Sequence, residues 1–319
     1  MSQPNYDTLV ISGGSHKGMI LIGAMQSVMD NIPNKNFVYL IGTSAGSMIC
    51  YLLAIGYTPI EIMVYICTHR ILERMYSFNL IAMINSEGSV SYTPIQETLE
   101  KMTLDKIGKF LTMKELRDIT GKTLVCATYN RSRQIMEYIS PDNYPDLPCL
   151  IAVRMSSNIP MLFGKFKYFG FEYVDGGISD NFPIIEAEKL GNKVLGITLL
   201  PRIVREEQED EGFLEYLFSL LYVPINQSTI FRMSLTDKQK TTIFQIPSGT
   251  TGFINFNIKS TEKLNMFSEG YKHLKNLLNE QKDERENNKQ ELEKIERESE
   301  ALKVSEENKE KESEKKENT

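Results

Sequence analysis

The chain has 319 residues, of which 41% are hydrophobic and 24% are charged, and it contains 20 Gly, 12 Pro, 4 Cys and no Trp. This composition is typical of a globular protein and excludes collagen-like, wholly disordered and disulfide-scaffold chains. The formal net charge is −6, so the chain has no basic excess with which to attract nucleic acid, and no nucleic-acid partner is expected.

Strand-like and helix-like patterns alternate along the first 200 residues. The predicted strands cover residues 8–12, 37–41, 122–128 and 193–200. The predicted helices cover residues 17–30 and 45–55, stretches near 60–76, 94–117 and 182–190, and an apolar run over 213–223 that stops at Pro224. Such alternation is typical of a parallel sheet covered on both sides. We therefore predict an α/β fold with a mostly parallel central sheet and helices on both faces.

The composition changes sharply near residue 280. From Gln281 to Thr319 there are 14 acidic residues, 10 basic residues and no aromatic residue. The few apolar residues of this stretch cannot form a core, so we predict a solvated helix or disordered tail, whose protein partner is unknown. The remaining chain is predicted to be one catalytic domain over residues 6–280, with its motifs in 6–200 and a cap or helical part in 201–280.

The chain lacks the signals of secretion and of membrane insertion. Its first residues have neither a basic region nor an apolar stretch of signal length, and no apolar run approaches the ~18 residues of a membrane span. Its four cysteines show no metal-binding spacing, which indicates reduced thiols. We expect a cytoplasmic or intracellular protein without a transmembrane segment and without a metal site.

The first motif with chemical meaning is Gly42-Thr-Ser44-Ala-Gly46. It fits G-x-S-x-G and lies between a predicted strand and a predicted helix, where a serine stands on a tight turn with its hydroxyl exposed. The helix that follows adds positive potential near a developing oxyanion. The alternative is an ordinary turn between a strand and a helix.

A second small-residue loop, Gly13-Gly14-Ser15-His-Lys17-Gly18, also joins a predicted strand to a helix. Backbone N–H groups in such a loop can bind an anion. The loop matches neither the P-loop pattern nor the dinucleotide fingerprint. An oxyanion hole for Ser44 therefore fits better than a phosphate site, and a turn without a ligand is the remaining alternative.

The third motif is Asp175-Gly176-Gly177, which follows the strand-like run Phe171–Val174. A carboxylate followed by two glycines can approach a partner closely, although a plain Asp-Gly turn is common. The following Asp180 and Asn181 are interpreted as residues of a turn or a helix start.

The histidines are poorly distributed for a Ser-His-Asp triad. A hydrolase of that type carries its histidine after the acid, and only His273 follows Asp175. The other two histidines lie in the glycine loop and on an early helix. An aspartate that acts directly as general base to Ser44 is therefore the better assignment.

The three motifs together, in this order, resemble the patatin-like phospholipase family over about residues 6–200. The resemblance implies that Ser44 is the nucleophile and Asp175 the base of a Ser-Asp dyad. It further implies an oxyanion hole of N–H groups around Gly14 and Ser15, with Lys17 at the family's basic position. Ser15 replaces a glycine of the family's loop, and serine does not adopt a positive φ easily.

The resemblance implies hydrolysis of fatty-acyl ester bonds of phospholipids or other lipids through an acyl-enzyme, without metal or organic cofactor. A peripheral contact with a membrane surface is expected. Residues 213–223 and an aromatic cluster over 161–171 are each interpreted as either a lipid-facing surface or buried core. The alternatives are an esterase or thioesterase with a triad that uses His273, and an inactive scaffold with an interaction tail.

Overall fold

The computed structural model describes residues 5–33, 35–75, 79–85, 88–200, 213–248, 258–284 and 287. Residues 1–274 form one compact unit and residues 275–319 a second. In the second unit, residues 275–284 are helical, and most of the predicted charged tail lies outside the described residues. The prediction that this tail is solvated or disordered is therefore not tested.

Eight strands form one sheet, and their bounds are β1 Tyr6–Ile11, β2 Lys35–Thr43, β3 Thr123–Asn130, β4 Ile135–Ile139, β5 Phe166–Tyr168, β6 Phe171–Asp175, β7 Val194–Leu199 and β8 Thr241–Ile246. The helices are α1 Gly18–Asn31, α2 Ala45–Ala54, α3 Pro59–Thr68, α4 Leu80–Ile84, α5 Thr93–Ile107, α6 Met113–Thr120, α7 Cys149–Ser156, α8 Ile184–Leu190 and α9 Phe213–Ser234. Single turns of 3-10 helix cover Ser15–Lys17 (η1), Glu73–Met75 (η2) and Gly176–Ile178 (η3).

The sheet has a parallel centre and an antiparallel edge. Its strand order is β5-β6-β3-β2-β1-β7-β8, and β4 pairs with β3. The pairs among β3, β2, β1, β7 and β8 are parallel, whereas β4, β5 and β6 pair antiparallel to their neighbours. This arrangement confirms the predicted α/β fold with a mostly parallel sheet.

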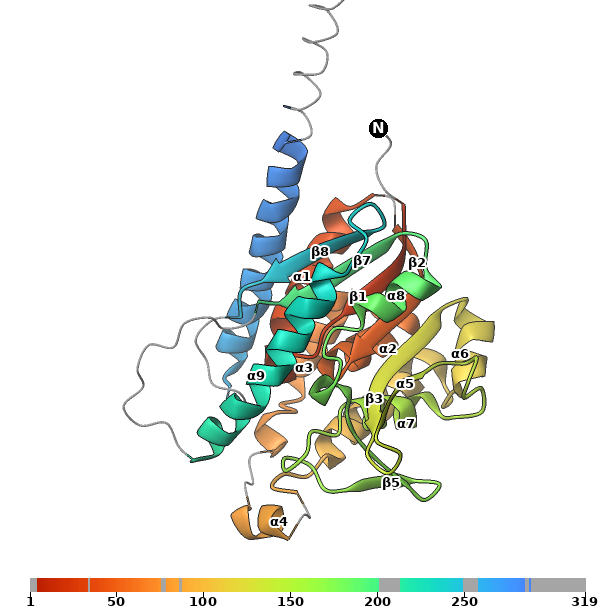
Figure 1. Ribbon diagram of the computed structural model, residues 1–319, viewed down its shortest axis with the longest axis vertical. Coiled ribbons are helices and arrows are strands. Elements are labelled where there is room, and N and C mark those ends of the chain that lie inside the picture. Colours follow the sequence, from red (N-terminus) through yellow and green to blue (C-terminus); the bar gives the residue numbers. More distant parts are fainter. Residues whose placement is uncertain are drawn as a thin grey trace, which may run out of the picture. The chain divides into compact units, whose positions relative to one another are not determined.

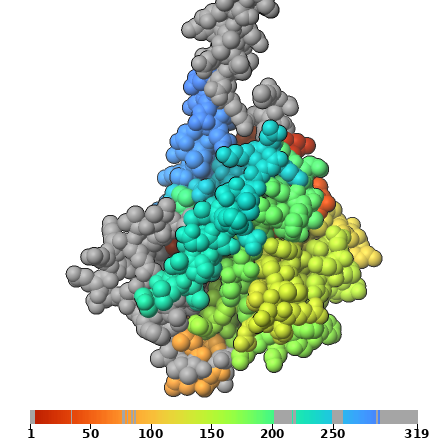
Figure 2. Space-filling model, viewed as in Figure 1, coloured from red at the N-terminus to blue at the C-terminus, as the bar shows by residue number. Residues whose placement is uncertain are grey.

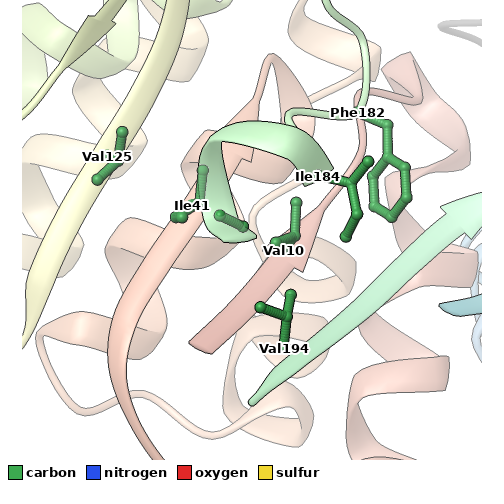
Figure 3. Close-up of a cluster of buried hydrophobic side chains, with 7 residues drawn as sticks. Val10, Ile41, Val125, Phe182, Ile184 and Val194 are labelled. Carbon is green, nitrogen blue, oxygen red and sulfur yellow. The ribbon is translucent and has the colours of Figure 1, made fainter. Parts of the chain in front are cut away.

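Helices cover both faces of the sheet (Figure 1). On one face, α8 packs on the central strands and α9 packs beside α8, whereas α1 and α2 cover the other face. Between α8 and the sheet lies a buried apolar cluster, drawn in Figure 3, made of Val10, Ile41, Val125, Phe182, Ile184, Ala187 and Val194. Burial of these apolar side chains between α8 and the sheet stabilises the central strands.

Two predicted helix boundaries were wrong. The stretch near 94–117 divides into α5 and α6, because Gly108 adopts a left-handed conformation (φ +81°) that ends α5. The run over 213–223 does not stop at Pro224, since α9 continues to Ser234. Pro224 is exposed, so the carbonyl group that its ring deprives of a donor can be solvated.

A helix over residues 260–274 packs closely on α1. A Cβ atom at Gly23 would lie 1.9 Å from the carbonyl oxygen of Phe267, and one at Gly270 would lie 2.0 Å from that of Ile20. Glycine at both positions lets the two backbones approach, and Lys263 on the same helix forms a buried ion pair with Glu73 of η2 at 2.8 Å. Residues 260–274 of this helix are thus part of the first unit.

We expect Gly23→Ala to lower the free energy of unfolding by about 1–3 kcal/mol, because the added methyl group must push the two helix backbones apart. Denaturant unfolding would measure this change. Met29→Ala, on the exposed part of the same helix, is the control and should change stability little. Equal stability of Gly23→Ala and the wild type would contradict the close packing.

Candidate active site

Ser44 stands on a strained turn between β2 and α2. Its backbone has φ +54° and ψ −123°, a conformation that L-amino acids rarely adopt, and it forms the N-cap of α2. This is the tight strand-to-helix turn that the G-x-S-x-G pattern predicts. The side chain is nearly buried, with 6% of its surface exposed, and it lines an internal cavity.

The two glycines of this motif are required by close backbone contacts. A Cβ atom at Gly42 would lie 2.4 Å from the carbonyl carbon of Gly46. A Cβ atom at Gly46 would lie 2.2 Å from the carbonyl oxygen of Ile11, at the end of β1. Any side chain at either position would force the turn away from the sheet, so these glycines hold Ser44 at the carboxyl edge of the parallel strands.

Strand register brings Asp175 to Ser44. β2 runs parallel to β3 and pairs as far as Thr43 with Ala127, whereas β6 runs antiparallel to β3 and its last pair is Asp175 with Thr128. Because β4 occupies the other edge of β3 over the same residues, β2 and β6 share one edge and run toward each other. Their carboxyl ends therefore meet, with Ser44 after one strand and Asp175 at the end of the other.

The Asp175 carboxylate is buried, with 5% of the residue exposed. Its Oδ1 accepts a hydrogen bond from the Gly177 N–H at 2.7 Å, while Oδ2 has no hydrogen-bond partner among the described residues. Burial raises the pKa of Asp175 to about 6, although the Ser44 hydroxyl and the Gly177 N–H both favour the charged form. A carboxylate with this pKa is ionised at neutral pH and is basic enough to accept a proton.

Glycines also shape the turn after Asp175. A Cβ atom at Gly176 would lie 2.2 Å from the carbonyl oxygen of Ala127, and one at Gly177 would lie 2.9 Å from Asp175 Oδ1. The Asp175 N–H donates to the carbonyl oxygen of Asn158 at 2.9 Å. The predicted Asp-Gly-Gly motif is therefore a tightly packed turn that fixes the carboxylate, rather than an open surface turn.

A serine that the sequence analysis missed, Ser156, binds the turn that carries Ser44. The Ser44 N–H donates to Ser156 Oγ at 3.1 Å, and Ser156 Oγ donates to the carbonyl oxygen of Ala127 at 2.6 Å. Ser156 is the last residue of α7 and is fully buried. No local pattern marks it, because its role depends on α7 packing against β3.

The glycine-rich loop over residues 13–18 lies against the turn that carries Ser44. A Cβ atom at Gly13 would lie 3.3 Å from Ser44 Cβ, and one at Gly18 would lie 3.2 Å from Ala45 Cβ. The N–H groups of Gly14 and Ser15 have no hydrogen-bond partner within the described part of the chain. Ser15 adopts φ +50°, so the backbone takes a left-handed conformation although no glycine is present there.

The remaining loop residues build its scaffold. The Lys17 N–H donates to the Gly14 carbonyl oxygen at 2.9 Å and closes the single turn η1. Lys17 is the N-cap of α1, which begins at Gly18. The Gly13 N–H donates to the carbonyl oxygen of Asn181 at 3.0 Å, so the loop is tied to the segment that follows the Asp-Gly-Gly turn.

The interpretation of Asp180 as a helix-start residue was wrong. The helix α8 begins at Ile184 with Pro183 as its N-cap. The Asp180 side chain is instead buried, accepts a hydrogen bond from the Tyr138 hydroxyl at 2.6 Å and pairs with Arg232 of α9 at 3.4 Å. Burial raises the pKa of Asp180. Its role is to bind α9 and β4 to the turn that carries Asp175.

Ser44 opens onto an apolar cavity of about 160 Å³. Leucine, isoleucine and methionine side chains of α1, α2, α3 and α5 form most of its wall, together with Phe163. Ser15 and His16 of the glycine loop also line it, whereas the residues of its wall do not include His273. The arrangement joins a serine hydroxyl, a carboxylate and a loop with two available N–H groups to a space suited to an apolar chain.

Among the described residues, no group of three or more His, Cys, Asp or Glu side chains is arranged to hold a metal ion. Within the same residues, no single helix has the length and hydropathy of a membrane span; α2 and α3 reach them only when counted together across a bend of 118°.

Comparisons with known proteins identify relatives of this chain. The family model described as Patatin-like phospholipase matches residues 9–188. The chain is 37% identical over 194 residues to the probable lipid hydrolase 463L of Invertebrate iridescent virus 6, an alignment that covers 59% of this chain and 65% of that protein. It is 26% identical over 293 residues to the uncharacterized protein R571 of Acanthamoeba polyphaga mimivirus, covering 87% of this chain and 95% of that protein.

Among solved structures, VipD from Legionella pneumophila matches with a TM-score of 0.52 and 17% identity, covering 87% of this chain and 67% of the VipD chain. At this identity the match concerns the fold alone. The chain covers just under two thirds of the length of 463L.

The raised pKa of Asp175 predicts that Asp175→Asn is more stable than the wild type above pH 6. The folded carboxyl has a pKa of about 6 against an ordinary 3.8, so this group's contribution to stability falls as pH rises through that interval. The variant should gain about 3 kcal/mol at pH 8 and about nothing at pH 4. Denaturant unfolding at both pH values measures this, and a gain independent of pH would contradict it.

Proposed function

The chain belongs to the patatin-like phospholipase family, and from that premise we propose that it is a serine acyl hydrolase that cleaves fatty-acyl esters of phospholipids with Ser44 and Asp175. One observation carries the proposal: the strands β2 and β6 end against each other on one edge of β3, next to the apolar cavity. The resemblance of 463L, a probable lipid hydrolase, supports lipid as the class of substrate.

The proposed reaction is acyl transfer in two steps. In the first, the ionised Asp175 carboxylate takes the proton of Ser44 while Oγ attacks the ester carbonyl carbon. The N–H groups of Gly14 and Ser15 stabilise the negative oxygen of the tetrahedral intermediate. The C–O bond to the glycerol oxygen then breaks, and Asp175 returns the proton to this leaving alkoxide. The products of the step are a lysolipid and an acyl-Ser44 ester.

In the second step, water replaces the lysolipid. Asp175 takes a proton from the water, whose oxygen attacks the acyl carbonyl. The intermediate collapses, Ser44 Oγ leaves and recovers the proton from Asp175, and a free fatty acid is released. The single carboxylate thus acts as base and then as acid in each step, which a pKa of about 6 permits near neutral pH.

The cavity supports a fatty acyl chain as the group that is transferred. Its wall is apolar apart from a few hydroxyl groups and His16, so it favours methylene groups over polar ones. Lys17 belongs to the loop next to Ser44 and stands at the position that the family resemblance marks as basic.

A histidine-dependent esterase is the alternative mechanism. His273 does not line the cavity, whereas the Ser44 hydroxyl favours the charged form of the Asp175 carboxylate. His16 does line the cavity, so a substitution of His16 is included in the test of a histidine-dependent mechanism. These observations favour the dyad, and an inactive scaffold has no observation in its favour.

We expect Ser44→Ala and Asp175→Asn each to lower kcat/KM at least about 10³-fold, because each removes a partner in every proton transfer. Mass spectrometry of fatty acids released from mixed phospholipid and triglyceride dispersions measures the loss and identifies the substrate class. The matched control is His273→Ala, which should keep activity within about two-fold. Folded Asp175→Asn with full activity, or a His16→Ala variant as inactive as Ser44→Ala, would contradict the dyad.

The pH dependence follows from the raised pKa of Asp175. The base must be ionised, so kcat/KM should fall about tenfold per pH unit below pH 6 and be level above about pH 7. A soluble short-chain ester assayed from pH 4.5 to pH 9 gives this profile independently of vesicle binding. A profile with its acidic midpoint above about pH 7.5 would point to a different base.

A further inference from the structure

The turn between β5 and β6 exposes an aromatic ring that the fold does not need. Phe169 and Gly170 form a two-residue hairpin turn with φ values of +45° and +83°. Such turns favour Asn, Asp or Gly, and phenylalanine is strained there. Phe169 is 85% exposed, and its ring forms an edge-to-face pair with the adjacent Tyr168 ring, at 4.6 Å between centroids. The side chain therefore contributes little to the stability of the fold.

The neighbouring hairpin turn, between β3 and β4, lies beside this one. The Arg131 N–H donates to the carbonyl oxygen of Glu172 at 2.9 Å, and the Glu172 N–H donates to Ser132 Oγ at 2.8 Å. The Arg133 guanidinium lies 4.1 Å above the ring of Phe171. Residues 131–135 and 165–171 thus form one continuous surface, which we call the paired-hairpin surface.

This surface is positively charged toward solvent although the chain as a whole is acidic. Its cations are exposed: the side chains of Arg131 and Arg133 are 60% and 49% accessible, and Lys165 and Lys167 are also exposed. The acidic partner of Arg131, Glu172, is only 13% accessible. The other neighbouring acid, Glu137, pairs with Arg133 and is 9% accessible. The outward field is therefore that of the cations.

The paired-hairpin surface borders the proposed site. A hollow of about 430 Å³ is lined by Arg131 and Lys165 on this surface and by Phe163, which also lines the cavity at Ser44. The strand β6 leads directly from the exposed turn to Asp175. A lipid held at this surface is thus close to the cavity that receives its acyl chain.

We propose that the paired-hairpin surface docks this protein on an anionic lipid membrane, with Phe169 inserted at the interface and the four cations against lipid phosphates. This inference rests on the proposed function, because a phospholipid hydrolase must reach substrate that resides in a membrane. An aromatic ring flanked by lysines and arginines is the chemistry that an anionic lipid interface binds. The strained turn is then explained, since it presents the ring to the membrane rather than to the core.

The test is flotation with vesicles of phosphatidylcholine, with or without about a third of phosphatidylserine. The wild type should bind the anionic vesicles, and high salt should weaken that binding. Phe169→Asn should lower the partition coefficient about tenfold. The same variant should keep or raise the melting temperature, because asparagine suits this turn. If Phe169 had only a structural role, vesicle binding would fall only together with the melting temperature.

Charge reversal tests the second element of the surface. Lys165→Glu with Lys167→Glu should lower binding by at least about tenfold and remove the salt dependence. The matched control for the Phe169 substitution is Phe231→Ala on α9. The Phe231 ring is 63% exposed and belongs to neither hairpin, so this variant should bind vesicles as the wild type does. Absence of wild-type binding to anionic vesicles, or full binding by both hairpin variants, would overturn the inference.

A soluble short-chain ester separates this inference from the proposed function. All three variants should hydrolyse it at the wild-type rate, because none of these residues lines the cavity at Ser44. A wild type that binds anionic vesicles through Phe169 but does not hydrolyse the ester would support the docking surface and overturn the function. A wild type that hydrolyses the ester but does not bind vesicles would support the proposed function and overturn the docking surface.

Discussion

Burial of the Asp175 carboxylate next to Ser44 is the interaction on which the rest of the site depends. The carboxylate accepts a hydrogen bond from Gly177 and is also stabilised by the Ser44 hydroxyl, but burial outweighs both and raises its pKa to about 6. An exposed carboxylate with an ordinary pKa would be a much weaker base for a serine hydroxyl. The strand register that buries Asp175 is therefore also what gives it basicity.

Glycines make this arrangement possible because four backbone segments converge at the site. Gly46 touches the end of β1, and Gly176 touches β3 at Ala127. Gly13 lies against both Ser44 and Asn181. A methyl group at any of these positions would collide with the facing segment, so that one of the two would have to move. The motifs are thus packing requirements first, and their chemistry follows from the proximity that the packing enforces.

Backbone strain is concentrated where side chains must be presented rather than packed. Non-glycine residues with positive φ occur at six described positions: Ser15, Ser44, Arg70, Gln134, Met161 and Phe169. Ser15 and Ser44 belong to the proposed site, and Gln134 and Phe169 to the paired-hairpin surface. Figure 2 shows α9 running across this face of the molecule. Exposed apolar side chains on this helix include Tyr216, Leu220, Leu221 and Val223. Of the two interpretations of residues 213–223, buried core does not hold for these four side chains.

The sequence by itself determined the central strands, the strand-to-helix turn at Ser44 and the turn at Asp175. These features depend on a local pattern, which is an apolar run of strand length followed by small residues. It placed the end of α9 wrongly at Pro224, since the tolerance of a proline inside a helix depends on its exposure. Only the tertiary structure decided that β2 and β6 meet on one edge of β3, which no local pattern encodes. Ser156, the cavity wall and the contact between the two hairpins likewise arise from residues that are distant in the chain. Their roles are set by strand register and helix packing, which are properties of the whole fold.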